Sequence, residues 1–155
     1  MRYLGLDLGT KTLGLSISDE LGCIATSYKI LRHDEDYDSL LPLLKQEIEM
    51  KNIKALVLGL PKNMNNSIGE RGEIALAFQK KLEEEFSLPV YMEDERLTTK
   101  QAESILIKND TSRKKRKKVI DSLAATIILQ SFLDREGQKR WKKIHLKWLQ
   151  KMDKK

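Results

Sequence analysis

Residues 2–19 decide the fold: Arg-Tyr-Leu-Gly-Leu-Asp-Leu-Gly-Thr-Lys-Thr-Leu-Gly-Leu-Ser-Ile-Ser-Asp. Apolar side chains alternate loosely over 2–8 and cleanly over 13–19, which is the two-residue period of a β-strand. A turn at 20–22 leads into a third expected strand over 24–31. Three consecutive strands with short links predict an antiparallel meander.

Beyond the meander, helical and strand patterns alternate. Two matches to the capping-box spacing, Ser67 with Glu70 and Thr98 with Gln101, mark helix starts, and Gly137 is expected to break the last helical stretch. Strands alternating with helices imply an α/β fold, with a mixed sheet and helices on its faces. The elements expected in chain order are a helix over 37–50, a strand over 54–58, a helix over 68–86, a strand over 90–92, and helices over 98–107, 119–134 and 138–152.

The composition indicates one globular domain. A chain of 155 residues with 40% hydrophobic and 34% charged side chains is long enough to bury a core. No apolar run approaches the roughly 20 residues of a membrane span, and the strand-like N-terminus leaves no room for a signal peptide. A single cysteine, Cys23, excludes an intramolecular disulfide. We therefore expect a cytoplasmic protein with no membrane association.

The net charge of +6 is spread unevenly. The segment 108–118 and the tail 136–155 each carry a net +6, which leaves a net −6 on the rest of the chain. Two basic appendages on an acidic body predict that the appendages bind a polyanion. The alternative is that both are only solubilising, and 108–118 is expected to be a mobile loop.

Two aspartates stand where a charge is unusual. Asp7 ends the first strand between Gly5 and Gly9, and glycines there allow a ligand to approach. The alternative is a turn-starting aspartate that caps its own backbone. Asp121 falls on an apolar helical face, four residues before Ala125, so its burial requires a cation, a metal or hydrogen-bond donors. The alternative is a helix N-cap.

A third acidic feature, Glu93-Asp94-Glu95-Arg96, follows the strand at 90–92. Loops at that edge of an α/β sheet favour ligands, although a solvated charged loop is the alternative. Three carboxylates at one edge suit hard divalent cations, and a pair of such ions can hydrolyse phosphodiesters. Two histidines and one cysteine cannot build a Cys/His zinc site. The chain also has neither a G-x-S-x-G elbow nor a Walker A loop.

Four separated motifs resemble those of the YqgF (RuvX) family of Holliday junction resolvase-like nucleases. They are GLDLGTKTLGLSISD (5–19), LGLPKNMNNSIG (58–69), DERLTT (94–99) and DSLAATIILQ (121–130), and the resemblance covers about residues 1–134. It implies a ribonuclease H-like fold with a mixed five-stranded sheet of order 3-2-1-4-5, strand 2 antiparallel, flanked by helices. It also implies that the catalytic, metal-binding acids fall on Asp7, Glu95 and Asp121.

The sequence departs from junction-resolving relatives beside the first strand. The neighbouring strand runs into Gly59-Leu60-Pro61 and carries no acid. Glu95 must then take that role, with Glu93 and Asp94 as substitutes. The expected cofactor is Mg²⁺ or Mn²⁺.

Basic and polar residues near these acids are expected to bind substrate. The loop 59–69 enters a helix, and helix N-termini bind phosphate. Lys11 and Arg96 suit contact with the scissile phosphate, or are structural salt-bridge partners. The expected substrate-binding residues are Lys11, Asn63, Asn66, Ser67, Arg96, Arg113, Lys114, Lys115, Arg116, Lys117 and Lys118.

Residues 136–155 are expected to form a C-terminal extension to a nuclease domain over 1–135. Trp141, Ile144, Trp148 and Met152 recur at helical spacing among lysines, which predicts a basic amphipathic helix. Such a helix can pack on the acidic body, bind a partner, stack on RNA bases or lie on a membrane surface. Packing within the molecule is the expected outcome.

Three functions remain open from the sequence. The first is a divalent-metal-dependent nuclease that, by family resemblance, processes the 5′ end of pre-16S rRNA in ribosome biogenesis, with Holliday junction resolution in DNA as the alternative. The second is an actin-like nucleotide-binding lobe, because Asp7, Gly9 and Gly14 also match that phosphate loop, although 155 residues supply only one of two lobes. The third is a non-catalytic nucleic-acid-binding assembly factor. The expected partner is structured RNA or branched DNA, and the expected state is a monomer or homodimer.

Overall fold

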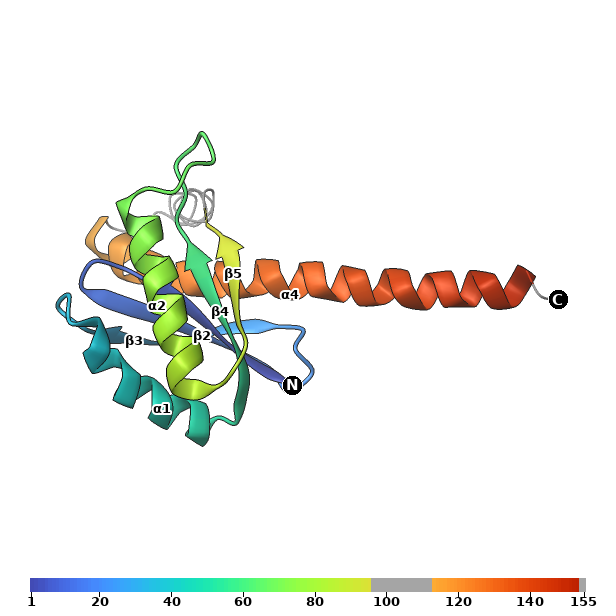
Figure 1. Ribbon diagram of the computed structural model, residues 1–155, viewed down its shortest axis with the longest axis horizontal. Coiled ribbons are helices and arrows are strands. Elements are labelled where there is room, and N and C mark those ends of the chain that lie inside the picture. Colours follow the sequence, from blue (N-terminus) through green and yellow to red (C-terminus); the bar gives the residue numbers. More distant parts are fainter. Residues whose placement is uncertain (96–112, 154–155) are drawn as a thin grey trace.

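A computed structural model of the chain describes residues 1–95 and 113–153, with side chains from 123 onward in the second range. Figure 1 shows a central sheet with helices on both faces and one long helix that extends beyond the sheet. The elements are β1 (Arg2–Leu8), β2 (Thr12–Ser18), β3 (Ala25–Arg32), η1 (Tyr37–Ser39), α1 (Leu40–Met50), β4 (Ile53–Leu60), α2 (Glu70–Phe86), β5 (Val90–Asp94) and α4 (Arg113–Asp153).

The five strands form one mixed sheet in the order β3-β2-β1-β4-β5. β2 is antiparallel to both β1 and β3, whereas β4 is parallel to β1 and β5 is parallel to β4. This is the strand order that the family resemblance implies. Because β1, β4 and β5 are parallel, their carboxyl ends lie at one edge of the sheet, where Leu60 pairs with Asp94.

Alternation along the strands divides the core into two layers. Leu56 and Leu58 belong to the cluster under α1 and α2, whereas Val57 packs against Ile128 and Leu129 of α4. The antiparallel meander and the parallel strands therefore share one sheet with α1 and α2 on one face and α4 on the other (Figure 1).

Helix α4 crosses the sheet at very close range. The hydroxyl of Ser16 on β2 donates a 2.6 Å hydrogen bond to the backbone carbonyl of Ala125. A Cβ atom on Gly5 would lie 2.8 Å from Cβ of Leu129, so β1 needs glycine there. Small residues on both sides of the contact allow this approach and hold α4 directly over the end of the sheet that carries Asp7.

The expected breaks around α4 are wrong. Gly137 does not end a helix: α4 continues through it, since one glycine costs a helix only about 1 kcal/mol. Residues 113–118 are helical, whereas a loop was expected there. The helices expected over 119–134 and 138–152 are both parts of the continuous helix α4. The expected helix over 98–107 lies outside the described residues.

The capping box at Ser67 is also wrong. α2 starts at Glu70 with Gly69 as its N-cap and without a side-chain capping bond. The Ser67 hydroxyl donates instead to Oδ1 of Asn65, at 2.6 Å.

Within the described ranges, none of the helices is both long and apolar enough to cross a bilayer.

Candidate active site

Asp7 and Glu95 meet at the carboxyl edge of the sheet. Asp7 lies on β1 opposite Gly14 of β2. Glu95 follows β5 directly, where its backbone N–H donates a 3.2 Å hydrogen bond to the carbonyl of Leu60. The side chains of Asp7 and Glu95 are hydrogen-bonded to each other. Two acids separated by 88 positions in sequence thus form one pair.

Gly59 on β4 makes this contact possible. β4 lies between β1 and β5, so the Glu95 side chain must pass over it to reach Asp7. A Cβ atom at position 59 would overlap Oε2 of Glu95 and come within 2.6 Å of Cδ1 of Ile128. Glycine in place of an acid on β4 therefore leaves the space that the Glu95 carboxyl occupies.

The pair holds a proton at neutral pH. Burial first, then the charge of Asp7 and the hydrogen bond to Asp7, together raise the pKa of Glu95 to about 8. The charge of Arg71 acts oppositely and lowers the pKa of Glu95. A protonated Glu95 therefore donates to the Asp7 carboxylate when no cation is bound.

Both acids lie on the face that α4 covers. Asp7 is two residues beyond Gly5, whose absent Cβ would meet Leu129 of α4, and alternate strand residues share a face. Asp121 belongs to α4, one helical turn before Ala125, so the helical backbone that the sequence argument required is present. The side chain of Asp121 lies outside the described residues.

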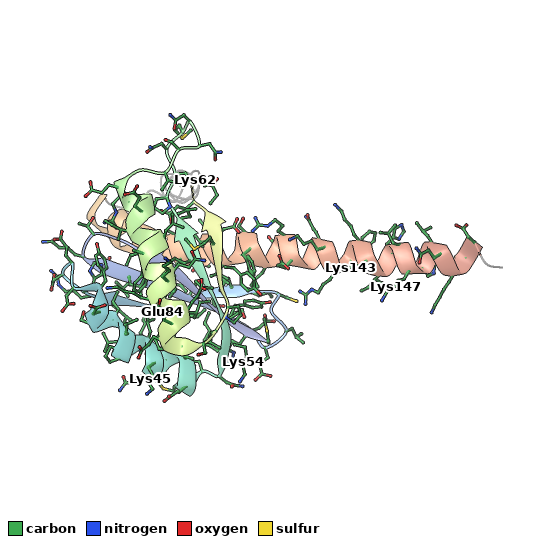
Figure 2. All side chains as sticks on the ribbon, viewed as in Figure 1. Lys45, Lys54, Lys62, Glu84, Lys143 and Lys147 are labelled. Carbon is green, nitrogen blue, oxygen red and sulfur yellow. The ribbon has the colours of Figure 1, made fainter. Side chains whose placement is uncertain are left out.

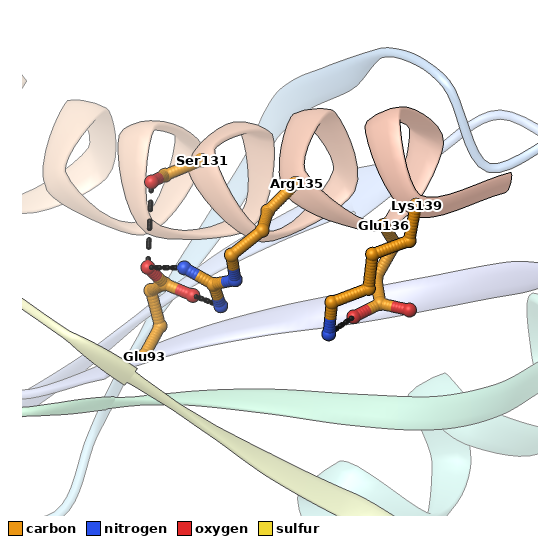
Figure 3. Close-up of polar contacts among 5 residues, drawn as sticks. All are labelled: Glu93, Ser131, Arg135, Glu136 and Lys139. Atoms are coloured by element: carbon orange, nitrogen blue, oxygen red, sulfur yellow. Dashed lines mark hydrogen bonds and ion pairs between the residues drawn. The ribbon is translucent and has the colours of Figure 1, made fainter. Parts of the chain in front are cut away.

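Glu93, one of the two substitutes for Glu95, is bound elsewhere. Glu93 is buried, and it accepts hydrogen bonds from Arg135, at 2.8 Å from Nη1, and from Ser131, at 3.3 Å. Figure 3 shows this ion pair, which joins β5 to α4. Asp94 is exposed at the end of β5. Glu95 is hydrogen-bonded to Asp7, whereas Glu93 is bound to Arg135 and Ser131.

Two residues that the sequence reasoning missed support this edge. Arg71, in the first turn of α2, donates a 3.1 Å hydrogen bond from Nη2 to the carbonyl of Leu8. His33 is buried, accepts at Nδ1 from the N–H of Glu35 and therefore donates from Nε2 to the carbonyl of Gly9, at 2.9 Å. Neither residue lies in a distinctive sequence motif. The one signal of a functional role is position, because Arg71 follows the loop 61–69 and His33 follows β3.

The expected substrate-binding residues fall into three groups. Lys11 is exposed in the turn between β1 and β2. Asn63, Asn66 and Ser67 lie in the loop that projects beyond β4 in Figure 1, where Asn63 Nδ2 donates to the Ser67 hydroxyl at 2.9 Å. Arg96, together with the side chains of 113–118, lies outside the described residues.

The Asp7–Glu95 pair fits a divalent cation. Carboxylate oxygens are the ligands that Mg²⁺ and Mn²⁺ prefer. Because the two carboxyl groups share one proton, a cation can bind in place of that proton. Among the side chains that the structure describes, no three histidine, cysteine, aspartate or glutamate residues gather as a metal site. Asp7 and Glu95 are two acids that do meet among the described side chains.

Comparison with known proteins places the chain in a family. The sequence profile of RuvX, described as Holliday junction resolvase, matches residues 1–135. A Geobacillus protein (strain WCH70) named "Putative pre-16S rRNA nuclease" is 53% identical over 135 residues, which cover 86% of this chain and 98% of that protein. A Bacillus subtilis protein of the same name is 51% identical with the same coverage.

Solved structures support the fold. Thermus thermophilus RuvC in complex with a Holliday junction substrate has a TM-score of 0.55 at 18% identity, over 88% of this chain and 96% of that one. The yeast mitochondrial Holliday junction resolvase Ydc2 has a TM-score of 0.51 at 15% identity, over 94% and 83%. The chain belongs to the RuvX (YqgF) family of Holliday junction resolvase-like nucleases and has their ribonuclease H-like fold.

Proposed function

We propose that this chain is a divalent-metal-dependent nuclease that hydrolyses phosphodiester bonds of structured RNA, at the 5′ end of pre-16S rRNA. Asp7, Glu95 and Asp121 are its metal ligands. The observation that carries the proposal is the Asp7–Glu95 pair, held together across Gly59 at the edge of the sheet. The RNA substrate follows from the names of relatives that are about 50% identical to this chain.

The protein's own residues prepare the site in two ways. Asp7 and Glu95 exchange their shared proton for a cation, and the raised pKa of Glu95 means that this exchange becomes easier toward pH 8. Arg71 keeps a positive charge beside the pair while it holds the end of β1. Bound there, two divalent ions would activate a water and stabilise the leaving oxygen.

Asp121 completes the ligand set in this proposal. A helix that packs on the sheet through Ala125 brings position 121 to the same side as Asp7. An unpaired carboxylate there would be costly to bury, and a shared cation offsets that cost. Lys11 and the loop 61–69 would contact the nucleic acid beside the acids.

The test is cleavage of defined substrates by the full chain. A precursor RNA with an unprocessed 5′ end and a four-way DNA junction are incubated with Mg²⁺ or Mn²⁺, and parallel samples contain EDTA. We expect metal-dependent cutting of the RNA. Asp7→Asn, Glu95→Gln and Asp121→Asn should each lower the rate at least about 100-fold, since even outer-shell changes at metal sites cost 10–100-fold.

Two controls make the result specific. Glu84→Gln changes an exposed acid of α2, labelled in Figure 2, and should leave the rate unchanged. Asp94→Asn tests whether the neighbour of Glu95 serves instead, and we expect less than a threefold loss. Retained cutting by Asp7→Asn would contradict the proposed site, binding without cutting would leave an assembly factor, and preferential cutting of the junction would identify a DNA resolvase.

A further inference from the structure

We propose that residues 138–152 of α4, the far helix, bind a single-stranded segment of the nucleic acid substrate. The segment would stack on the aromatic side chains of the far helix and pair its phosphates with the lysines. This inference rests on the proposed function for the class of partner. It concerns a surface beyond residue 135, where the match to the family profile ends.

The far helix packs on nothing in the described part of the chain. Every residue from 138 to 153 is exposed, and Figure 1 shows this part of α4 extending away from the sheet. Trp141 is 63% exposed and Trp148 is 54% exposed, with Ile144 and Met152 also more than half exposed. The expectation that this helix packs on the acidic body is therefore wrong. A contiguous exposed apolar face of this kind marks an interaction surface.

The aromatic rings on this face are arranged for stacking. His145 lies between the two tryptophans, 4.8 Å from the Trp141 ring with an angle of 13° and 6.1 Å from the Trp148 ring with an angle of 19°. With Ile144, these rings line one shallow hollow. Near-parallel, exposed rings are the platforms on which proteins stack unpaired bases. A base pair inside a duplex cannot use such a platform, so the face favours single strands.

The charge of the far helix selects a polyanion. Residues 138–152 contain six lysines or arginines and no acid. Figure 2 shows the side chains of Lys143 and Lys147 on this projecting part of α4. A second copy of the chain is disfavoured as the occupant, because two helices of this charge would repel each other when paired. A phosphate backbone instead gains from every lysine that it meets.

Continuity of α4 sets the distance between the two surfaces. Ala125 lies over the sheet beside the candidate site, and Trp148 follows it by 23 residues in the same helix. At 1.5 Å per residue the separation is about 35 Å. That length corresponds to about ten stacked nucleotides at about 3.4 Å each. The substrate would therefore need a flank of about this length to contact both surfaces.

The experiment measures binding separately from cutting. Full-length Glu95→Gln protein in EDTA is titrated with an RNA duplex and with the same duplex carrying a ten-nucleotide single-stranded flank. The chain has only two tryptophans, Trp141 and Trp148, so their fluorescence reports on this surface alone. We expect the flanked RNA to bind at least tenfold more tightly and to quench the tryptophans, since stacking on each base is worth about 1–3 kcal/mol.

Two variants separate stacking from charge. Trp141→Ala/Trp148→Ala should remove the tenfold gain for the flank, measured by anisotropy of labelled RNA. Lys143→Gln/Lys147→Gln should lower the slope of log Kd against log salt by about 1.4 for the flanked RNA. The matched control, Leu21→Ala/Met50→Ala, removes two apolar side chains from the body that are 75% and 65% exposed, and it should change neither quantity. Circular dichroism verifies that all variants remain helical.

Three results would overturn the proposal. The first is equal affinity for flanked and unflanked RNA. The second is a blue shift of the tryptophans on vesicles of phosphatidylglycerol with no quenching by RNA, which would assign a lipid surface. The third is self-association that Trp141→Ala/Trp148→Ala abolishes. If the flanked RNA binds more tightly but is never cut, the proposed nuclease activity is refuted and the proposed binding surface is supported. If the RNA is cut but the flank does not increase affinity, the binding surface is refuted and the nuclease activity is supported.

Discussion

The two halves of α4 share one helical backbone and differ in everything around it. In the near half, Ala125, Ile128 and Leu129 are completely buried against the sheet. In the far half, from 138 to 153, every residue is exposed. An isolated helix of about 15 residues is marginal in water, so the far half depends on continuity with the near half. The near half therefore serves the fold and the candidate site, whereas the far half is available for binding.

The largest difference should come from glycine substitutions near each half. Gly59→Ala places a methyl group where the Glu95 carboxyl and Ile128 lie, so Glu95 must move away from Asp7. We expect at least about 100-fold slower cleavage. Gly137→Ala meets nothing within 4 Å and should leave cleavage unchanged while it stabilises α4 by about 1 kcal/mol. Equal rates for both variants in the RNA assay would mean that the Asp7–Glu95 contact is dispensable.

Leucine truncation in each half should sharpen the contrast in stability. Leu129→Ala empties a fully buried position and should lower the free energy of unfolding by about 2–5 kcal/mol. Leu149→Ala removes the same atoms from an exposed position and should change it by less than about 0.5 kcal/mol. Urea denaturation monitored by far-ultraviolet circular dichroism measures both. Similar losses would show that the far half is buried in solution.

Ion pairs in the two halves provide a smaller comparison. Arg135→Ala leaves the buried carboxylate of Glu93 without its cation, which should cost about 3 kcal/mol of stability. Lys139→Ala breaks the exposed pair with Glu136, drawn beside it in Figure 3, and should cost no more than about 0.5 kcal/mol. Thermal unfolding measures the loss of stability in each variant. A small loss in Arg135→Ala would mean that the Glu93 carboxylate finds another partner.

The smallest expected effect is a pH dependence confined to the site under the near half. The pKa of Glu95 is about 8 in the folded chain and near 4.5 when unfolded, so the folded state binds more protons between these values. Stability in EDTA should therefore fall as pH rises from about 6.5 to about 8, by an amount on the order of 2 kcal/mol.

Glu95→Gln should remove this fall, because glutamine does not titrate. Parallel urea titrations at pH 5, 6.5 and 8 give the slope for each protein. An unchanged slope in the variant would assign the titration to another group.

Most of the architecture was predictable because it follows from local periodicity. The strands over 2–8 and 13–19 appear within one residue of their expected bounds, as Arg2–Leu8 and Thr12–Ser18. The expected ends of elements were wrong where they rested on a weak local signal, such as one glycine. Gly137 costs too little to stop a helix that continues on both sides. Strand β5 runs to Asp94, which moves Glu93 from an expected loop into a buried ion pair.

The sequence by itself determined the two-residue and helical periods, the uneven charge and the acids that stand at the ends of strands. It also raised Glu95 as the acid to accompany Asp7, because β4 has none. Only the tertiary structure decided that Glu95 reaches Asp7 across Gly59, that Arg71 joins them and that the far helix packs on nothing described. The reason is physical: periodicity is a property of neighbours along the chain, whereas contact and burial depend on which distant segments approach closely.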